Sequence, residues 1–191
     1  MSKIAAVILC LLTLLSSGCS FALIETPIGE TLSIKEKRAF EGNWLTNDGE
    51  LLRITIGSNG ELVAGGIEFN EDKNKFTAKT HKFVTRKVGD VSYFYFRMKK
   101  HGYLFFRVES EDEDTLELFT ADIEKFGQSV ESGELDGKIL KRGKDKDKSD
   151  VILSVADPSS TDSKLYQILA AKDRNDWFEE ESVTYHRFKR N

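Results

Sequence analysis

The sequence is poor in cysteine and proline. Its 191 residues include only two cysteines, Cys10 and Cys19, both near the N-terminus. The chain after residue 19 therefore cannot form an internal disulfide, and an exported domain built from it must depend on its core. Proline occurs only at Pro27 and Pro158, while thirteen Phe, five Tyr and two Trp give a composition unlike that of a disordered chain.

The start of the chain lacks charge. Lys3 is the only charged residue before Glu25, and residues 4–15 read IAAVILCLLTLL. This apolar run is too short for a transmembrane helix, which needs about 20 residues. A basic start, a short apolar run and then small residues are typical of a secretory signal peptide. We therefore predict a signal peptide over residues 1–18; the alternative is a buried N-terminal helix, but the run has no polar face.

Small residues and a cysteine follow the apolar run. The segment Leu15-Ser16-Ser17-Gly18-Cys19 resembles the lipobox of bacterial lipoproteins, although Ser16 stands where Leu is usual. The resemblance implies cleavage before Cys19, diacylglycerol on its thiol and acylation of the new amine by a chain such as palmitate. Because each buried methylene contributes about 0.8 kcal/mol, several chains would anchor the protein firmly. Ordinary cleavage that leaves an unmodified cysteine is the alternative.

The residues after Cys19 bear on location and organisation. In lipoproteins of bacteria with two membranes, Asp after the cysteine marks inner-membrane retention, so Ser20 implies the periplasmic face of the outer membrane. Residues 19–38 contain Pro27 and Gly29 and little periodicity, and we predict that they form the lipidated N-terminus and a tether. Residues 39–191 are long enough for a single β-rich domain.

The chain also lacks an excess of positive charge. It has 28 Lys and Arg against 32 Asp and Glu, a formal net charge of −4. Removal of residues 1–18 takes away Lys3 and makes the balance one unit more negative. Nucleic-acid-binding proteins favour clustered Lys and Arg, so we predict no nucleic-acid partner.

Catalytic signatures are missing as well. There is no GxSxG elbow, and the three histidines, His81, His101 and His186, have no partner at the HExxH spacing. Residues 137–145 resemble a P-loop, but the run is one residue too long and ends at Asp145 where Ser or Thr is needed. No two carboxylates stand out as a glycosidase pair. We therefore predict a protein that is not an enzyme and has no cofactor or metal.

From Gly42 onward the sequence reads as short strands separated by turns. Apolar residues alternate with polar ones over residues 52–56, and Asn59-Gly60 follows as a hairpin signal. Residues 91–99 and 103–109 form the clearest hairpin. About eight to ten such strands predict a mainly β fold, an antiparallel barrel or sandwich. One or two short helices are expected, over residues 122–131 and after Ser160 or Thr161.

One short motif resembles a known barrel family. Gly42-Asn43-Trp44, at the head of the first strand, is similar to the Gly-X-Trp motif of the lipocalin-like barrels. The resemblance implies that Trp44 closes one end of the barrel and that an Arg near the last strand lies across it. Arg187 is the candidate, through a cation–π contact of about 0.5–2 kcal/mol. The family's Thr-Asp-Tyr turn is missing, and an ordinary core role for Trp44 is the alternative.

Two functions remain open. The first is a non-catalytic, lipid-anchored cell-envelope protein whose barrel-like domain serves interaction with an envelope protein or structure. The second is a lipocalin-like carrier of a small hydrophobic ligand. The many Phe and Tyr side chains favour a filled barrel and the first function. Room for a ligand would come from four small residues, Ala64, Gly65, Gly66 and Ala78.

Aromatic residues on both faces of the 91–109 hairpin raise a further question. An exposed patch there would suit a protein partner. Its members are Tyr93, Tyr95, Tyr103 and Phe105. The alternative is that the second predicted helix, over residues 161–172, covers them.

Overall fold

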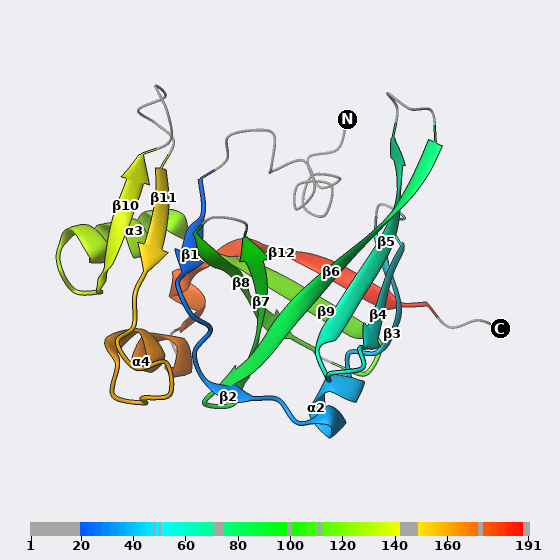
Figure 1. Ribbon diagram of the computed structural model, residues 1–191, viewed down its shortest axis with the longest axis horizontal. Coiled ribbons are helices and arrows are strands. Elements are labelled where there is room, and N and C mark those ends of the chain that lie inside the picture. The colour runs from blue at the N-terminus through cyan, green and yellow to red at the C-terminus, as the bar shows by residue number, and fades with distance from the viewer. Residues whose placement is uncertain are drawn as a thin grey trace.

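A closed barrel of eight antiparallel strands dominates the structure (Figure 1). This computed structural model describes residues 20–47, 49, 51–70, 75–98, 101–110, 112–141, 149–171 and 174–188. The barrel strands are β3 (Gly42–Thr46), β4 (Leu51–Ile56), β5 (Leu62–Asn70), β6 (Lys75–Val88), β7 (Val91–Met98), β8 (Gly102–Glu109), β9 (Thr115–Ala121) and β12 (Phe178–Arg187). The predicted mainly β fold with an antiparallel barrel is confirmed.

The barrel is a meander closed by the last strand. Strands β3 to β9 pair in order along the chain, and β12 joins the ring between β9 and β3. The turn between β4 and β5 contains the predicted Asn59-Gly60 pair, and Gly60 adopts a φ of 79° that glycine accommodates without strain. The pairing continues without a register shift through Gly65 and Gly66.

The remaining elements lie outside the ring. They are β1 (Ala22–Ile24), β2 (Glu30–Thr31), α2 (Ile34–Arg38), α3 (Ile123–Glu131), β10 (Gly137–Lys141), β11 (Ser149–Leu153), α4 (Lys164–Ala170) and the 3₁₀ turn η1 (Arg174–Trp177). Strand β1 pairs with β8 and runs parallel to β11, which extends the sheet beyond the barrel. The long segment between β9 and β12 therefore forms an outer layer against one side of the barrel (Figure 1).

The outer layer covers the aromatic face of the β7–β8 hairpin. Tyr93, Tyr95 and Phe105 are fully buried in a second apolar cluster shared with α3 and α4. The Tyr93 hydroxyl donates a hydrogen bond of 2.9 Å to the carbonyl of Leu169 in α4. An exposed aromatic patch on this hairpin is therefore wrong, and the alternative of a covering helix is confirmed.

The predicted tether is also wrong. Residues 22–24 form β1 and are almost completely buried, and Ile28 and Leu32 are buried further along. Helix α2 then begins after Ser33, whose hydroxyl and the carboxylate of Glu36 form a capping box. These apolar residues pack on the barrel, so residues 21–38 belong to the folded domain. The predicted signal peptide and Cys19 lie outside the described residues.

The two predicted helices are present, with one shifted start. Asp122 caps α3 as expected. Helix α4 begins later than expected, because Ser163 is its N-cap and accepts a hydrogen bond from the Tyr166 amide. The Ser160 hydroxyl is instead used in the preceding turn, where it accepts from the Asp162 amide.

Candidate functional site

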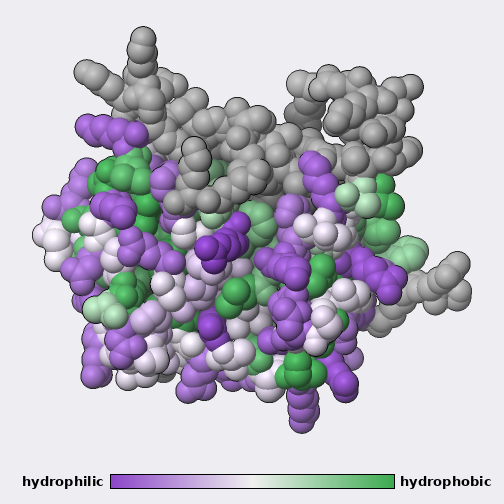
Figure 2. Space-filling view, viewed as in Figure 1, coloured by the Kyte–Doolittle hydropathy of each residue, from purple (hydrophilic) through white to green (hydrophobic). Residues whose placement is uncertain are grey.

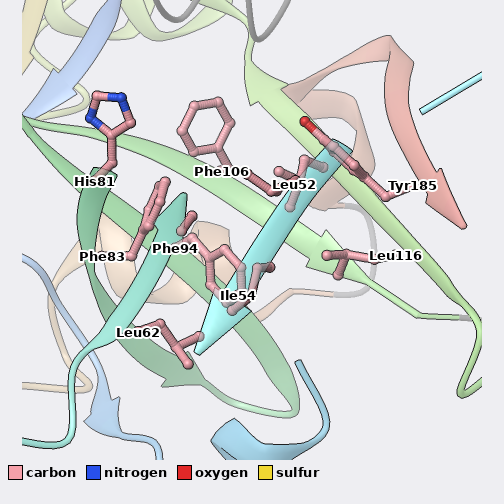
Figure 3. Close-up of a pocket in the computed structure, with 11 residues that line it drawn as sticks. Leu52, Ile54, Leu62, His81, Phe83, Phe94, Phe106, Leu116 and Tyr185 are labelled. Atoms are coloured by element: carbon pink, nitrogen blue, oxygen red, sulfur yellow. The ribbon is translucent and has the colours of Figure 1, made fainter. Parts of the chain in front are cut away.

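The barrel interior holds an apolar cavity with a free volume of about 50 Å³ (Figure 3). Inward positions alternate along each strand, and side chains from seven of the eight barrel strands meet here. The lining consists of Leu52, Ile54, Leu62, Ala64, His81, Phe83, Phe94, Phe106, Leu116, Leu118 and Tyr185. Nine of these eleven side chains are hydrocarbon, so the cavity suits an apolar group.

Small side chains leave this space open. Ala64 lies on the inner face of β5 and lines the cavity, and the same alternation places Gly66 on that face. By contrast, Gly65 and Ala78 lie on the outer face, where Ala78 is exposed to solvent. Of the four small residues that the sequence offered as room for a ligand, two therefore face the interior.

His81 is the titratable imidazole of the cavity. Its ring packs edge-on against Phe96, with 5.1 Å between centroids. The buried Nε2 atom has no hydrogen-bond partner among the described residues. Burial, with a smaller contribution from the charge of Lys79, lowers the pKa of His81 below its ordinary value. The imidazole is therefore neutral at neutral pH, and the described lining contains no carboxylate; its second polar side chain is Tyr185.

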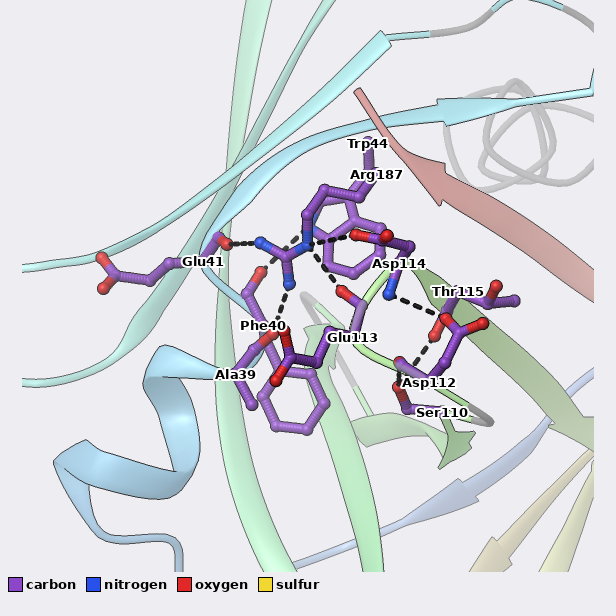
Figure 4. Close-up of polar contacts among 10 residues, drawn as sticks. All are labelled: Ala39, Phe40, Glu41, Trp44, Ser110, Asp112, Glu113, Asp114, Thr115 and Arg187. Atoms are coloured by element: carbon purple, nitrogen blue, oxygen red, sulfur yellow. Dashed lines mark hydrogen bonds and ion pairs between the residues drawn. The ribbon is translucent and has the colours of Figure 1, made fainter. Parts of the chain in front are cut away.

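At one end of the barrel, Arg187 lies across Trp44 (Figure 4). The guanidinium carbon is 4.3 Å from the centre of the indole ring. The same group donates hydrogen bonds to the carbonyls of Ala39, Glu41 and Glu113. The two residues that the sequence paired are thus in contact, at what we call the Arg187 end. No pattern in the sequence indicates the three carbonyl contacts.

Phe40 completes the Arg187 end. Its carbonyl accepts a hydrogen bond of 2.9 Å from the Trp44 indole, and its ring packs edge-on against Phe94 at 5.0 Å. Phe94 in turn lines the cavity. The segment that follows α2 therefore covers this end of the barrel, and the hydrogen bonds from Arg187 to Ala39 and Glu41 hold it in place.

The opposite end, which we call the β1 end, is covered by apolar side chains. Phe21, Leu23 and Ile152 belong to the same buried cluster as the barrel interior. The backbone holds this strand in place, because the Phe21 amide donates to the Asp150 carboxylate at 3.1 Å. The Ser20 hydroxyl likewise accepts from the Ser149 amide at 3.0 Å. The predicted lipid-bearing Cys19 precedes this point by a single residue.

An acidic groove of about 790 Å³ lies on the outer layer, away from the cavity. Its carboxylates include Asp122, Asp176, Glu179, Glu180 and Glu181. Arg107 contributes to the lining although only 2% of it is exposed, and its guanidinium stacks on Phe119 at 4.0 Å. Arg107 also donates to Asn175 at 2.6 Å and pairs with Glu109. The guanidinium thus ties η1 to the barrel wall, which is a structural role.

One carboxylate of this groove, that of Glu179, lies near other negatively charged side chains. Burial, followed by the charges of Asp122, Glu124 and Glu181, raises the pKa of Glu179 above its ordinary value. Among the described residues, no cluster of three or more His, Cys, Asp or Glu side chains is arranged to hold a metal ion. The groove therefore gives no specific chemistry to propose.

No family model, curated protein or solved structure matches this chain. Among the described residues, no helix has both the length and the hydrophobicity required to cross a bilayer.

Proposed function

We propose that this chain is a non-catalytic, lipid-anchored cell-envelope protein whose barrel is a filled interaction or structural domain. The size of the cavity carries the proposal. Ligand pockets commonly have volumes of about 300–1,000 Å³, whereas the barrel interior leaves about 50 Å³ free. Large side chains such as Phe83, Phe94 and Phe106 occupy the rest.

The chemistry of the interior supports a role without catalysis. A catalytic site needs a nucleophile or a proton-transfer group near a second polar group that orients it. The cavity places His81 and Tyr185 among hydrocarbon side chains, and the imidazole packs against the ring of Phe96. The Arg187 guanidinium at the end of the barrel is already bound to backbone carbonyls.

The N-terminal sequence supports the location. Lys3, the apolar run and Ser17-Gly18-Cys19 are the features on which the lipid anchor is proposed. With Cys19 acylated and Ser20 following it, the barrel would be held at the periplasmic face of the outer membrane. Its partners would then be the membrane itself and a protein of the cell envelope.

Metabolic labelling tests the anchor. Cells that produce the full chain are grown with an alkyne fatty acid, and the protein is then separated into membrane and soluble fractions. We expect label and membrane association in the wild type and loss of both in Cys19→Ala. A labelled Cys10→Ala variant is the matched control, because Cys10 would leave with the signal peptide. An unlabelled, freely soluble wild-type protein would contradict the proposal.

The alternative function is a carrier of a small hydrophobic ligand. It is favoured by the hydrocarbon lining of the cavity and by the room beside Ala64. Mass spectrometry of organic extracts of the purified protein separates the two functions. A stoichiometric apolar compound would support the carrier, whereas the filled domain should yield none apart from its own lipid anchor.

A further inference from the structure

Two large aliphatic residues are exposed side by side near the β1 end of the barrel. Leu51 is 49% exposed and Ile67 is 70% exposed. Leu52 pairs with Gly66 across β4 and β5, so Leu51 and Ile67 follow as the next cross-strand neighbours on the outer face. Leu45 of β3 pairs with Leu51 and extends the row. We call Leu45, Leu51 and Ile67 the rim patch.

The rim patch interrupts the alternation of inward apolar and outward polar residues along its strands. Along β4 the inward residues Leu52 and Ile54 line the cavity, and the outward position next to Leu51 is the exposed Arg53. Folding of the barrel therefore gains little from Leu51 or Ile67. Figure 2 shows apolar colour over this region on the right-hand side of a largely hydrophilic face.

The chain enters the domain at the same end. Strand β1 begins, β5 ends and β6 begins toward the top of Figure 1. Ser20 and Phe21 are fixed there by hydrogen bonds to Ser149 and Asp150. An extended residue spans at most about 3.6 Å, so the Cα atom of a lipidated Cys19 would lie within roughly 7 Å of the Cα atom of Phe21.

We propose that the rim patch inserts into the surface of the lipid bilayer, so that the β1 end of the barrel faces the membrane. This inference rests on the proposed anchor at Cys19. With no tether between the lipid and β1, the anchor brings the β1 end against the bilayer. Exposed aliphatic side chains are then buried at the interface, while the charge of Arg53 reaches the anionic headgroups beside them.

Charge at the other end supports this orientation. The turn between β8 and β9 at the Arg187 end carries Asp112, Glu113 and Asp114. Hydrogen bonding to the carboxylate, led by the Asp114 amide, lowers the pKa of Asp112 and keeps it ionised. An acidic turn is repelled by anionic lipid, so this end is expected to point into the aqueous phase.

A probe at two matched isoleucines tests the orientation. Ile34, which is 46% exposed in α2 at the Arg187 end, is the control for Ile67. In the acylated protein the thiol of Cys19 is blocked and Cys10 is removed, so Ile67→Cys or Ile34→Cys supplies the single free thiol. Each variant is labelled with the fluorophore NBD and reconstituted in phosphatidylethanolamine–phosphatidylglycerol vesicles that contain doxyl-labelled phosphatidylcholine.

We expect a blue shift and quenching by the doxyl lipid for the probe at Ile67→Cys, and neither for the probe at Ile34→Cys. Leu51→Cys provides a second position in the rim patch, with the same expectation. Vesicle flotation and the circular dichroism spectrum show whether each variant is anchored and folded.

The outcomes separate the two proposals. Wild-type protein that does not float with vesicles overturns the anchor. Protein that floats but leaves the Ile67→Cys probe in water, or quenches the Ile34→Cys probe instead, overturns the orientation alone. If the Ile67→Cys probe is protected from aqueous iodide in native membranes but is not quenched by doxyl lipid, a protein covers the rim patch and the lipid is the wrong occupant.

Discussion

The two ends of the barrel are covered in different ways. At the Arg187 end, one guanidinium binds three backbone carbonyls and an indole ring, and the contacts are polar and directional. At the β1 end, Phe21 and Leu23 cover the interior with apolar contacts that have no such directionality. The Arg187 end thus relies on directional polar contacts that should stabilise the fold, whereas the β1 end is the side that would face the membrane under the proposed anchor at Cys19.

The largest effect is expected at Trp44, which is fully buried at the Arg187 end. Trp44→Ala should lower the free energy of unfolding by about 3–5 kcal/mol, because it leaves a large cavity and removes the hydrogen bond to Phe40. Urea denaturation of the purified protein measures this loss. Phe21→Ala at the β1 end should cost less, and a larger cost there would reverse the comparison.

Arg187 should give the next largest effect. Arg187→Ala removes hydrogen bonds made by a charged donor, and a hydrogen bond of this kind contributes about 1.5–3 kcal/mol. We therefore expect the free energy of unfolding to fall by about 2–3 kcal/mol. Arg187→Lys keeps the charge without the planar fork and should fall between the wild type and Arg187→Ala. Arg53→Ala is the control, because an exposed arginine should change the free energy of unfolding by less than about 0.5 kcal/mol. Equal effects for Arg187→Ala and Arg53→Ala would refute the stabilising role of the Arg187 hydrogen bonds.

Filling the cavity tests whether the interior has usable space. Ala64→Val adds two methyl groups beside the cavity, and β-branched residues suit a strand, so a gain of about 0.5–1 kcal/mol in the free energy of unfolding is expected. Ala78→Val on the exposed face of β6 is the matched control and should have almost no effect. A marked loss of stability in Ala64→Val would show that the interior is already full at this position.

The smallest effect concerns pH and His81. The unfolded chain takes up a proton on this residue near the ordinary pKa of 6.5, whereas the folded chain does so only at lower pH. Between these two values unfolding takes up a proton, so the free energy of unfolding falls as the pH is lowered and levels off below the folded pKa. His81→Leu should remove this part of the pH dependence. Identical pH profiles for the wild type and His81→Leu would contradict this explanation.

The sequence was sufficient for the barrel wall and for part of the Arg187 end. Alternation over residues 52–56 and the Asn59-Gly60 turn are local signals, and local signals predicted β4, its hairpin and the inward face. The pairing of Trp44 with Arg187 came from a family resemblance and not from periodicity. Their contact agrees with that resemblance at one end of the barrel, although no solved structure matches the chain.

The β1 end could not be predicted in the same way. Strand β1 is held by Asp150, which lies 129 residues further along the chain, and no local pattern in residues 20–38 indicates that partner. Alternation tells which face of a strand is apolar, but not which distant segment covers that face. For the same reason the sequence alone does not decide what covers Tyr93, Tyr95 and Phe105.

The most direct test of the account is the mass of the N-terminal peptide of mature protein isolated from membranes. We expect a peptide that begins at Cys19 and carries the added mass of diacylglycerol and an amide-linked acyl chain. A peptide that begins before Cys19, or one that begins at Cys19 with a free thiol and a free amine, would contradict it.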